Sequence, residues 1–142
     1  MNFPLNIVVN SEEETINLAK NFAALLNAGD IVLLNGDLGT GKTFFVKNIC
    51  AIFGIENVSS PSFTLVNEYK NGKKIFHLDF YRIKKVEELY DIGIDEYLGD
   101  NEAIVFIEWS DLYKEVVPKH RYKINLKYVN NSSREISILK NE

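Results

Sequence analysis

The stretch that decides the fold is "LLNGDLGTGKTFF", residues 33–45. Its centre, "GDLGTGKT" from Gly36 to Thr43, satisfies G-x-x-x-x-G-K-[ST], a pattern in which the backbone amides of a glycine-rich turn surround phosphate groups. A short apolar run precedes the turn, and a segment with helical periodicity follows it from Thr43 to Phe53, with Gly54 as its expected stop. Strand, turn and helix in this order are the context that a phosphate-binding loop requires. The turn is therefore predicted to hold the polyphosphate of a nucleotide.

Each residue type in the turn has a physical task. Glycines allow the amides to approach a phosphate closely, and the N-terminus of the next helix adds partial positive charge. Lys42 is expected to place a full charge on the outer phosphates, and the Thr43 hydroxyl is expected to ligate Mg²⁺. The predicted cofactor site comprises Gly36, Asp37, Leu38, Gly39, Thr40, Gly41, Lys42, Thr43 and Phe44.

Two acids at strand ends are the predicted catalytic residues. Glu108 closes the apolar run "AIVFIE" and is expected to complete the magnesium shell with Thr43. Asp79 closes "IFHLD", where a carboxylate could orient water or a metal-bound water. The polar turn "VSSPSFTLV", residues 58–66, is a candidate sensor of the terminal phosphate. His77 is interpreted as structural, because no Cys/His cluster offers the spacing of metal ligands.

The rest of the chain predicts an α/β fold, a P-loop NTPase-like three-layer domain with a mixed central sheet. "SEEE" places Ser11 as the N-cap of a helix that Gly29 is expected to stop, with Glu14 completing a capping box. The sheet is predicted to be parallel in its nucleotide-binding half and antiparallel towards the C-terminus. The predicted strands are 30–35, 63–69, 73–80, 103–109, 122–129 and 134–140, with a turn at "KNG", a short helix at 86–90 and no assignment for 92–99.

Composition limits the function. The 142 residues fit one domain, residues 1–142, and 46% apolar with 25% charged residues is typical of a soluble globular protein. A net charge of −4 argues against tight binding to a nucleic-acid backbone as the main activity. Apolar runs are far shorter than a membrane span requires, and no secretory signal is apparent, so the chain is expected in the cytoplasm. Cys50, the single cysteine, is expected to be a packed thiol.

Four motifs taken together, "GDLGTGKT", "SPSFTLV", "HLDFYR" and "IEW", resemble one family. This is the TsaE family, formerly YjeE, of small bacterial ATPases needed to make threonylcarbamoyladenosine on tRNAs. The resemblance runs from about Ser11 to Trp109. Two positions depart from the family pattern, Ser62 in place of threonine, which keeps the hydroxyl, and Phe80 in place of leucine, an apolar exchange that affects packing more than chemistry.

The resemblance implies a Mg-dependent ATPase that uses ATP and Mg²⁺ and turns over slowly alone. Glu108 stands where the family keeps its Walker-B-type acid, followed by a characteristic tryptophan, here Trp109. Asp79 matches an aspartate linked to hydrolysis, and Ser60 to Thr64 match a switch-like loop. The implied partners are the TsaD and TsaB proteins, with tRNA reached indirectly through their complex.

Other readings of the phosphate loop stay open at this point. A small-molecule kinase should carry several arginines in a lid, whereas Arg82, Arg121 and Arg134 are scattered along the chain. A GTPase should carry N-K-x-D and D-x-x-G strings, and neither occurs. A module that senses nucleotide without hydrolysis is harder to exclude. Arg82 could act as an arginine finger or pair with an acid, and Trp109 could contact nucleotide or a partner.

Overall fold

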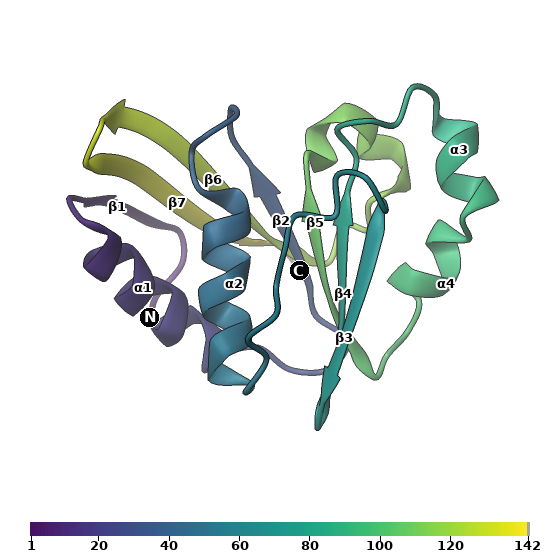
Figure 1. The fold of residues 1–142 in the computed structure, drawn as a ribbon, viewed down its shortest axis with the longest axis horizontal. Helices are drawn as coiled ribbons and strands as arrows, with labels where there is room; N and C mark the ends of the chain where they lie inside the picture. The colour runs from purple at the N-terminus through teal and green to yellow at the C-terminus, as the bar shows by residue number, and fades with distance from the viewer. Residues whose placement is uncertain (142) are drawn as a thin grey trace.

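The computed structural model describes residues 1–141. In this part of the chain, strands form one sheet in the order β1-β7-β6-β2-β5-β4-β3 (Figure 1). The strands are β1 (Leu5–Val9), β2 (Ile31–Asn35), β3 (Val66–Asn71), β4 (Lys73–Asp79), β5 (Ala103–Glu108), β6 (Arg121–Asn130) and β7 (Ser133–Asn141). The helices are α1 (Glu12–Ala23), α2 (Lys42–Ile52), α3 (Val86–Asp91) and α4 (Ile94–Leu98), and a kinked 3-10 segment covers Ser110–Val116.

The sheet is mixed, as predicted. The central strand β2 runs parallel to both β5 and β6, and β4 runs parallel to β5. The pairs β6–β7, β1–β7 and β3–β4 are antiparallel. The carboxyl ends of β2, β4 and β5 consequently meet at one edge of the sheet, which is where ligands bind in open α/β sheets.

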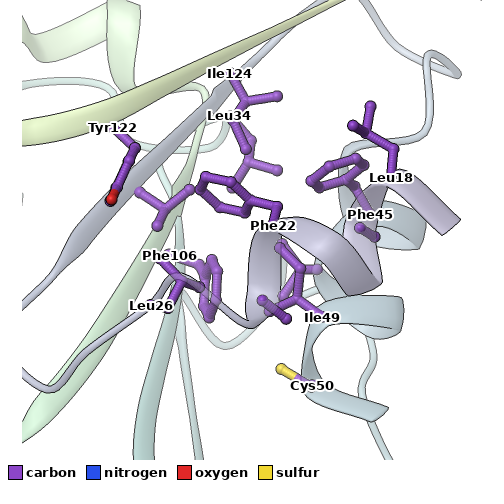
Figure 2. Packing of buried hydrophobic residues seen from close by; sticks show 14 of the residues in the cluster. Leu18, Phe22, Leu26, Leu34, Phe45, Ile49, Cys50, Phe106, Tyr122 and Ile124 are labelled. Carbon is purple, nitrogen blue, oxygen red and sulfur yellow. The ribbon is translucent and has the colours of Figure 1, made fainter. Parts of the chain in front are cut away.

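Helices cover both faces of the sheet, which gives three layers. Successive side chains of a strand point to opposite faces. In β2, Val32 and Leu34 join the apolar cluster under α1 and α2, whereas Ile31 and Leu33 join the cluster under α3 and α4. Figure 2 shows the first cluster, where residues of α1 and α2 meet those of the central strands. The fully buried residues of this cluster include Phe22, Phe45, Ile49, Leu34 and Phe106.

Helix α1 begins where the sequence predicts and ends earlier. The Ser11 hydroxyl accepts a hydrogen bond from the Glu14 N–H at 3.1 Å, which is the N-cap half of the predicted capping box. The helix stops at Ala23, not next to Gly29. Gly29, with φ of 94°, instead donates its N–H to the Ala103 carbonyl oxygen at 2.8 Å. This hydrogen bond places the start of β2 beside β5, so Gly29 contributes to the sheet and does not end the helix.

Other differences from the predictions lie at edges and loops. Strand β1 was not predicted from the sequence. It lacks the burial pattern of a core strand, because Ile7 and Val8 are exposed and only Val9 of its residues is buried. The predicted strand at 63–69 starts later, at Val66, and residues 92–99, left unassigned, contain α4. None of the described helices has the length and apolar character needed to cross a membrane.

Candidate nucleotide-binding site

The predicted phosphate loop leaves β2 at Asn35 and enters α2 at Lys42. Gly36 has no room for a side chain, because a Cβ there would lie 2.4 Å from the Leu126 carbonyl oxygen of β6 and 2.7 Å from Thr40 Oγ1. The Thr40 hydroxyl donates to the Asp37 carbonyl oxygen at 2.8 Å and closes the turn. Gly39 and Gly41 have φ of 79° and 101°, a region that disfavours other residues. The loop is thus held in one shape against β6.

Lys42 is buried inside this loop. Its Nζ donates to the carbonyl oxygens of Gly36 at 2.5 Å and Asp37 at 2.9 Å, and it lies 4.3 Å from the centre of the Trp109 ring. Burial lowers the pKa of the Lys42 ammonium, while the nearby carboxylates of Glu108 and Asp79 oppose that shift. The amino group of Lys42 is thus held at the centre of the loop by two carbonyl oxygens, which phosphate oxygens could replace.

The two predicted acids stand side by side. The register of β4 and β5 pairs Asp79 with Glu108, and both side chains are buried at the strand ends. Glu108 Oε2 accepts a hydrogen bond from the Thr43 hydroxyl at 2.8 Å, which links β5 to the first turn of α2. Burial raises the pKa of the Asp79 carboxyl and the Glu108 carboxylate adds to the rise, whereas the Tyr81 N–H, donating at 2.8 Å, opposes it.

A cavity of about 340 Å³ lies over these groups. It brings together most of the predicted site, and its lining includes Leu38, Gly39, Gly41, Lys42, Thr43, Phe44, Asp79 and Glu108. Three other predicted residues do not line it. Gly36 and Asp37 reach the site through their carbonyl oxygens on Lys42, and Thr40 lines a neighbouring cavity.

The candidate sensor turn contributes only in part. Ser60 and Ser62 line the cavity. Thr64 is exposed, and its hydroxyl donates to Asn67 Oδ1 at 2.8 Å. The turn is closed by the Leu65 N–H, which donates to the Pro61 carbonyl oxygen at 2.7 Å, with Leu65 itself at a φ of 68°. The hydroxyls of Ser60 and Ser62 are the part of this turn that can meet a ligand.

Arg82 also lines the cavity, and within residues 1–141 it forms no ion pair. Its guanidinium stacks at 4.2 Å over the ring of Phe63, whose side chain is 83% exposed. The alternative in which Arg82 pairs with an acid is therefore not the arrangement seen in this part of the chain.

Trp109 follows Glu108 in a left-handed conformation, with φ of 61°. Such a conformation is unusual for a large side chain and marks a strained position. The backbone N–H of Trp109 donates to the Leu34 carbonyl oxygen at 3.2 Å. Its indole ring contacts the Tyr81 ring, with 4.8 Å between the ring centres. The tryptophan therefore forms part of the cavity wall beside Lys42.

Two features of the site were missed by sequence reasoning. His77 is completely buried, and its Nε2 lies 2.6 Å from Glu108 Oε2, so it does more than fill the core. Its position two residues before Asp79, on the same face of β4, was the available signal.

The second feature that sequence reasoning missed is a cavity of about 450 Å³ on the other side of Gly41 and Phe44. Its lining includes Asn10, Ser11, Glu12, Thr15, Thr40 and Arg134.

Comparison with known proteins agrees with this geometry. The family profile described as "Threonylcarbamoyl adenosine biosynthesis protein TsaE" matches residues 9–136. The tRNA threonylcarbamoyladenosine biosynthesis protein TsaE of Rickettsia bellii is 46% identical over 134 residues, 92% of each chain. The protein of that name from Bacillus subtilis is 39% identical over 127 residues, 88% of this chain and 78% of the other. A crystal structure of Bacillus subtilis YdiB superposes with a TM-score of 0.83 at 32% identity, covering 100% of this chain and 88% of that one.

The match confirms the resemblance read from the four motifs. It also extends beyond them, because the matched residues include β6 and the first residues of β7, where the sequence carried little identifying detail. The chain belongs to the TsaE family.

Proposed function

We propose that this protein binds ATP with Mg²⁺ and hydrolyses it slowly on its own, and that the hydrolysis serves threonylcarbamoyladenosine modification of tRNA through the TsaD–TsaB complex. The observation that carries the proposal is the 2.8 Å hydrogen bond from Thr43 Oγ1 to Glu108 Oε2, next to the buried Lys42. It joins the two residues expected to share a magnesium ion, one from the phosphate loop and one from a neighbouring strand.

The residues fit a magnesium nucleotide. The Thr43 proton is directed to Glu108, so the lone pairs of its oxygen are available to a cation. Hard oxygen ligands of this kind suit Mg²⁺, which usually binds through few protein groups together with phosphates and waters. Lys42 would exchange its carbonyl partners for phosphate oxygens, and loop amides at the start of α2 would donate to the same oxygens. The metal, when bound, supplies charge neutralisation between the phosphates.

Asp79 supports hydrolysis in preference to nucleotide sensing alone. It lies in the cavity beside Glu108, and the raised pKa of its buried carboxyl suits a group that orients a water and accepts a proton from it. Arg82 is the cation available for the developing charge, yet its guanidinium rests on Phe63. Slow turnover by the isolated protein is expected for this reason, because the guanidinium must leave the Phe63 ring before it can stabilise the transition state.

We assign the base and ribose to the second cavity. It meets the phosphate loop at Gly41 and Phe44, whereas Asp79 and Glu108 line only the first cavity. The terminal phosphate would then lie near the acids, and the chain of phosphates would lead over the start of α2 towards Ser11 and Arg134.

The surface around the first cavity suits the binding of a macromolecular partner. Leu38 and Phe63 are 69% and 83% exposed, and Leu38 lines the first cavity. Exposed apolar side chains that form a contiguous patch often mark an interaction surface. The family relationship supports TsaD and TsaB as the proteins that meet this surface in the cytoplasm, with tRNA reached through them.

The test is an ATPase assay of the purified protein with and without TsaD–TsaB. Slow, Mg-dependent release of phosphate that accelerates with the partners is the expected result. Equal rates with and without them would refute the coupling. Transfer of phosphate to a small molecule instead of water would favour the kinase alternative, and Mg-dependent binding without turnover in either condition would favour a sensing module.

A further inference from the structure

One oxygen of Glu108 carries two hydrogen bonds. Oε2 lies 2.8 Å from Thr43 Oγ1 and 2.6 Å from His77 Nε2. Within residues 1–141 no hydrogen bond reaches Oε1, and Glu108 lines the cavity over the phosphate loop. The carboxylate is therefore asymmetric, with one oxygen engaged by the protein and the other available to a ligand.

His77 reaches Glu108 from below the cavity. It is completely buried in β4 on the same face as Asp79, and it does not line the cavity itself. His77 can therefore act on a ligand only through its neighbours, and Glu108 is the neighbour to which it is hydrogen-bonded. The neighbouring Phe106 and Ile75, both fully buried, enclose the strands on this face.

The geometry defines which ring nitrogen carries the proton. An ionised carboxylate only accepts hydrogen bonds, so both Thr43 Oγ1 and His77 Nε2 must donate to Oε2. His77 Nδ1 is buried and has no hydrogen-bond partner in the described part of the chain. A proton on Nδ1 in place of Nε2 would bury an unpaired donor and direct a lone pair at the carboxylate, and both effects are unfavourable. The Nε2–H tautomer satisfies the pair.

We propose that His77 is a positioning residue that locks the Glu108 carboxylate through Oε2 and thereby presents Oε1 to the magnesium shell. The inference rests on the proposed function, in which Glu108 completes that shell. A free glutamate rotates about three bonds, and hydrogen bonds to one oxygen remove most of that freedom before the metal arrives. Outer partners of this kind typically change metal affinity by about 10- to 100-fold when removed.

Three substitutions separate hydrogen bonding from packing. His77→Gln keeps an amide donor at about the reach of Nε2, whereas His77→Asn places its amide near the position of Nδ1, too short for Glu108. His77→Leu removes the donor and keeps apolar bulk.

Metal affinity is measured by Mn²⁺ electron paramagnetic resonance of the ADP complex. Metal-free ADP affinity is measured by fluorescence of Trp109, the single tryptophan.

The expected result is a loss of Mn²⁺ affinity of about 10- to 100-fold in the Asn and Leu variants, affinity near wild type in the Gln variant, and unchanged metal-free ADP affinity in all three. Equal losses in all three variants, or none, would overturn the proposal. If wild-type protein with ADP failed to bind Mn²⁺, the proposed function would fail instead.

A measurement on the unmodified protein keeps the proposal testable where a variant does not fold. Nitrogen-15 NMR of the imidazole rings distinguishes the two tautomers, and the chain has only two histidines, His77 and His120. An Nε2–H signal from the buried ring is expected. A ring protonated at Nδ1 and not at Nε2 would refute the assignment.

Discussion

The contact between the phosphate loop and β6 can be tested with two glycines of the same loop. A Cβ at Gly36 would lie 2.4 Å from the Leu126 carbonyl oxygen, about 1 Å inside ordinary van der Waals contact. A Cβ at Gly39 would have no atom within 4 Å. Both glycines have positive φ, 154° and 79°, so backbone strain is present in both alanine variants, and Gly36→Ala adds the clash.

The expected destabilisation follows from these two terms. Gly39→Ala should lower the free energy of unfolding by about 1–2 kcal/mol, the cost of a side chain in a left-handed conformation. Gly36→Ala combines backbone strain at a φ of 154°, about 1–3 kcal/mol, with overpacking against backbone, about 1–3 kcal/mol, for a total of about 2–6 kcal/mol. This is a large share of the roughly 5–15 kcal/mol that stabilises a domain.

The assay is urea unfolding of the nucleotide-free proteins, followed by circular dichroism, so that effects of alanine on ligand binding do not enter. Gly36→Ala should have the lower midpoint, with an unchanged slope if unfolding remains two-state. A Gly36→Ala variant as stable as Gly39→Ala would refute the conclusion that β6 fixes the shape of the loop.

Three further predictions concern single side chains. Lys42→Ala should weaken ATP binding about 10- to 150-fold, the range for losing hydrogen bonds to charged groups, and titration calorimetry showing unchanged affinity would contradict the role of Lys42. Asp79→Asn should abolish turnover, spare ATP affinity and raise the melting temperature at pH 7. Burial raises the pKa of Asp79 in the folded protein above 3.8, so the stability that its protonated form contributes is lost as pH rises through that raised pKa. Asn carries no charge at pH 7 and can still accept a hydrogen bond from the Tyr81 N–H. A lower melting temperature of the Asn variant in calorimetry would count against this. Cys50, whose pKa burial raises from 9.0 to about 12, should resist thiol reagents at pH 8 in the native protein and react at once in urea, and rapid native labelling would show the thiol to be accessible.

Local signals in the sequence predicted the centre of the molecule well. The buried run of β2, the N-cap at Ser11 and the Asn71-Gly72 turn depend on neighbours within a few residues, and the structure contains all three. The turn from Gly36 to Thr43 between β2 and α2 was predictable for the same reason, because glycine spacing and one lysine define it locally, and its binding of phosphate stays a prediction.

Features that depend on strand order were not predictable. Strand β1 exposes most of its residues and is held by pairing with β7, far along the chain. The second cavity combines residues near 10–15, 40–44 and 126–136, which only the order β1-β7-β6-β2 brings together. The bond between His77 and Glu108 likewise requires the parallel pairing of β4 with β5.

The pairing of β1 with β7 has a consequence for biosynthesis. Leu5 pairs with Ile138 and Val9 with Arg134, so β1 is synthesised about 130 residues before the strand that it joins. At about 5–20 residues per second this wait lasts roughly 6–27 seconds. The loop from Gly36 to Thr43 depends in turn on Leu126 of β6, so a nascent chain cannot shape the proposed nucleotide site before β6 is made. Ribosome-bound chains halted before β6 should therefore fail to retain ATP.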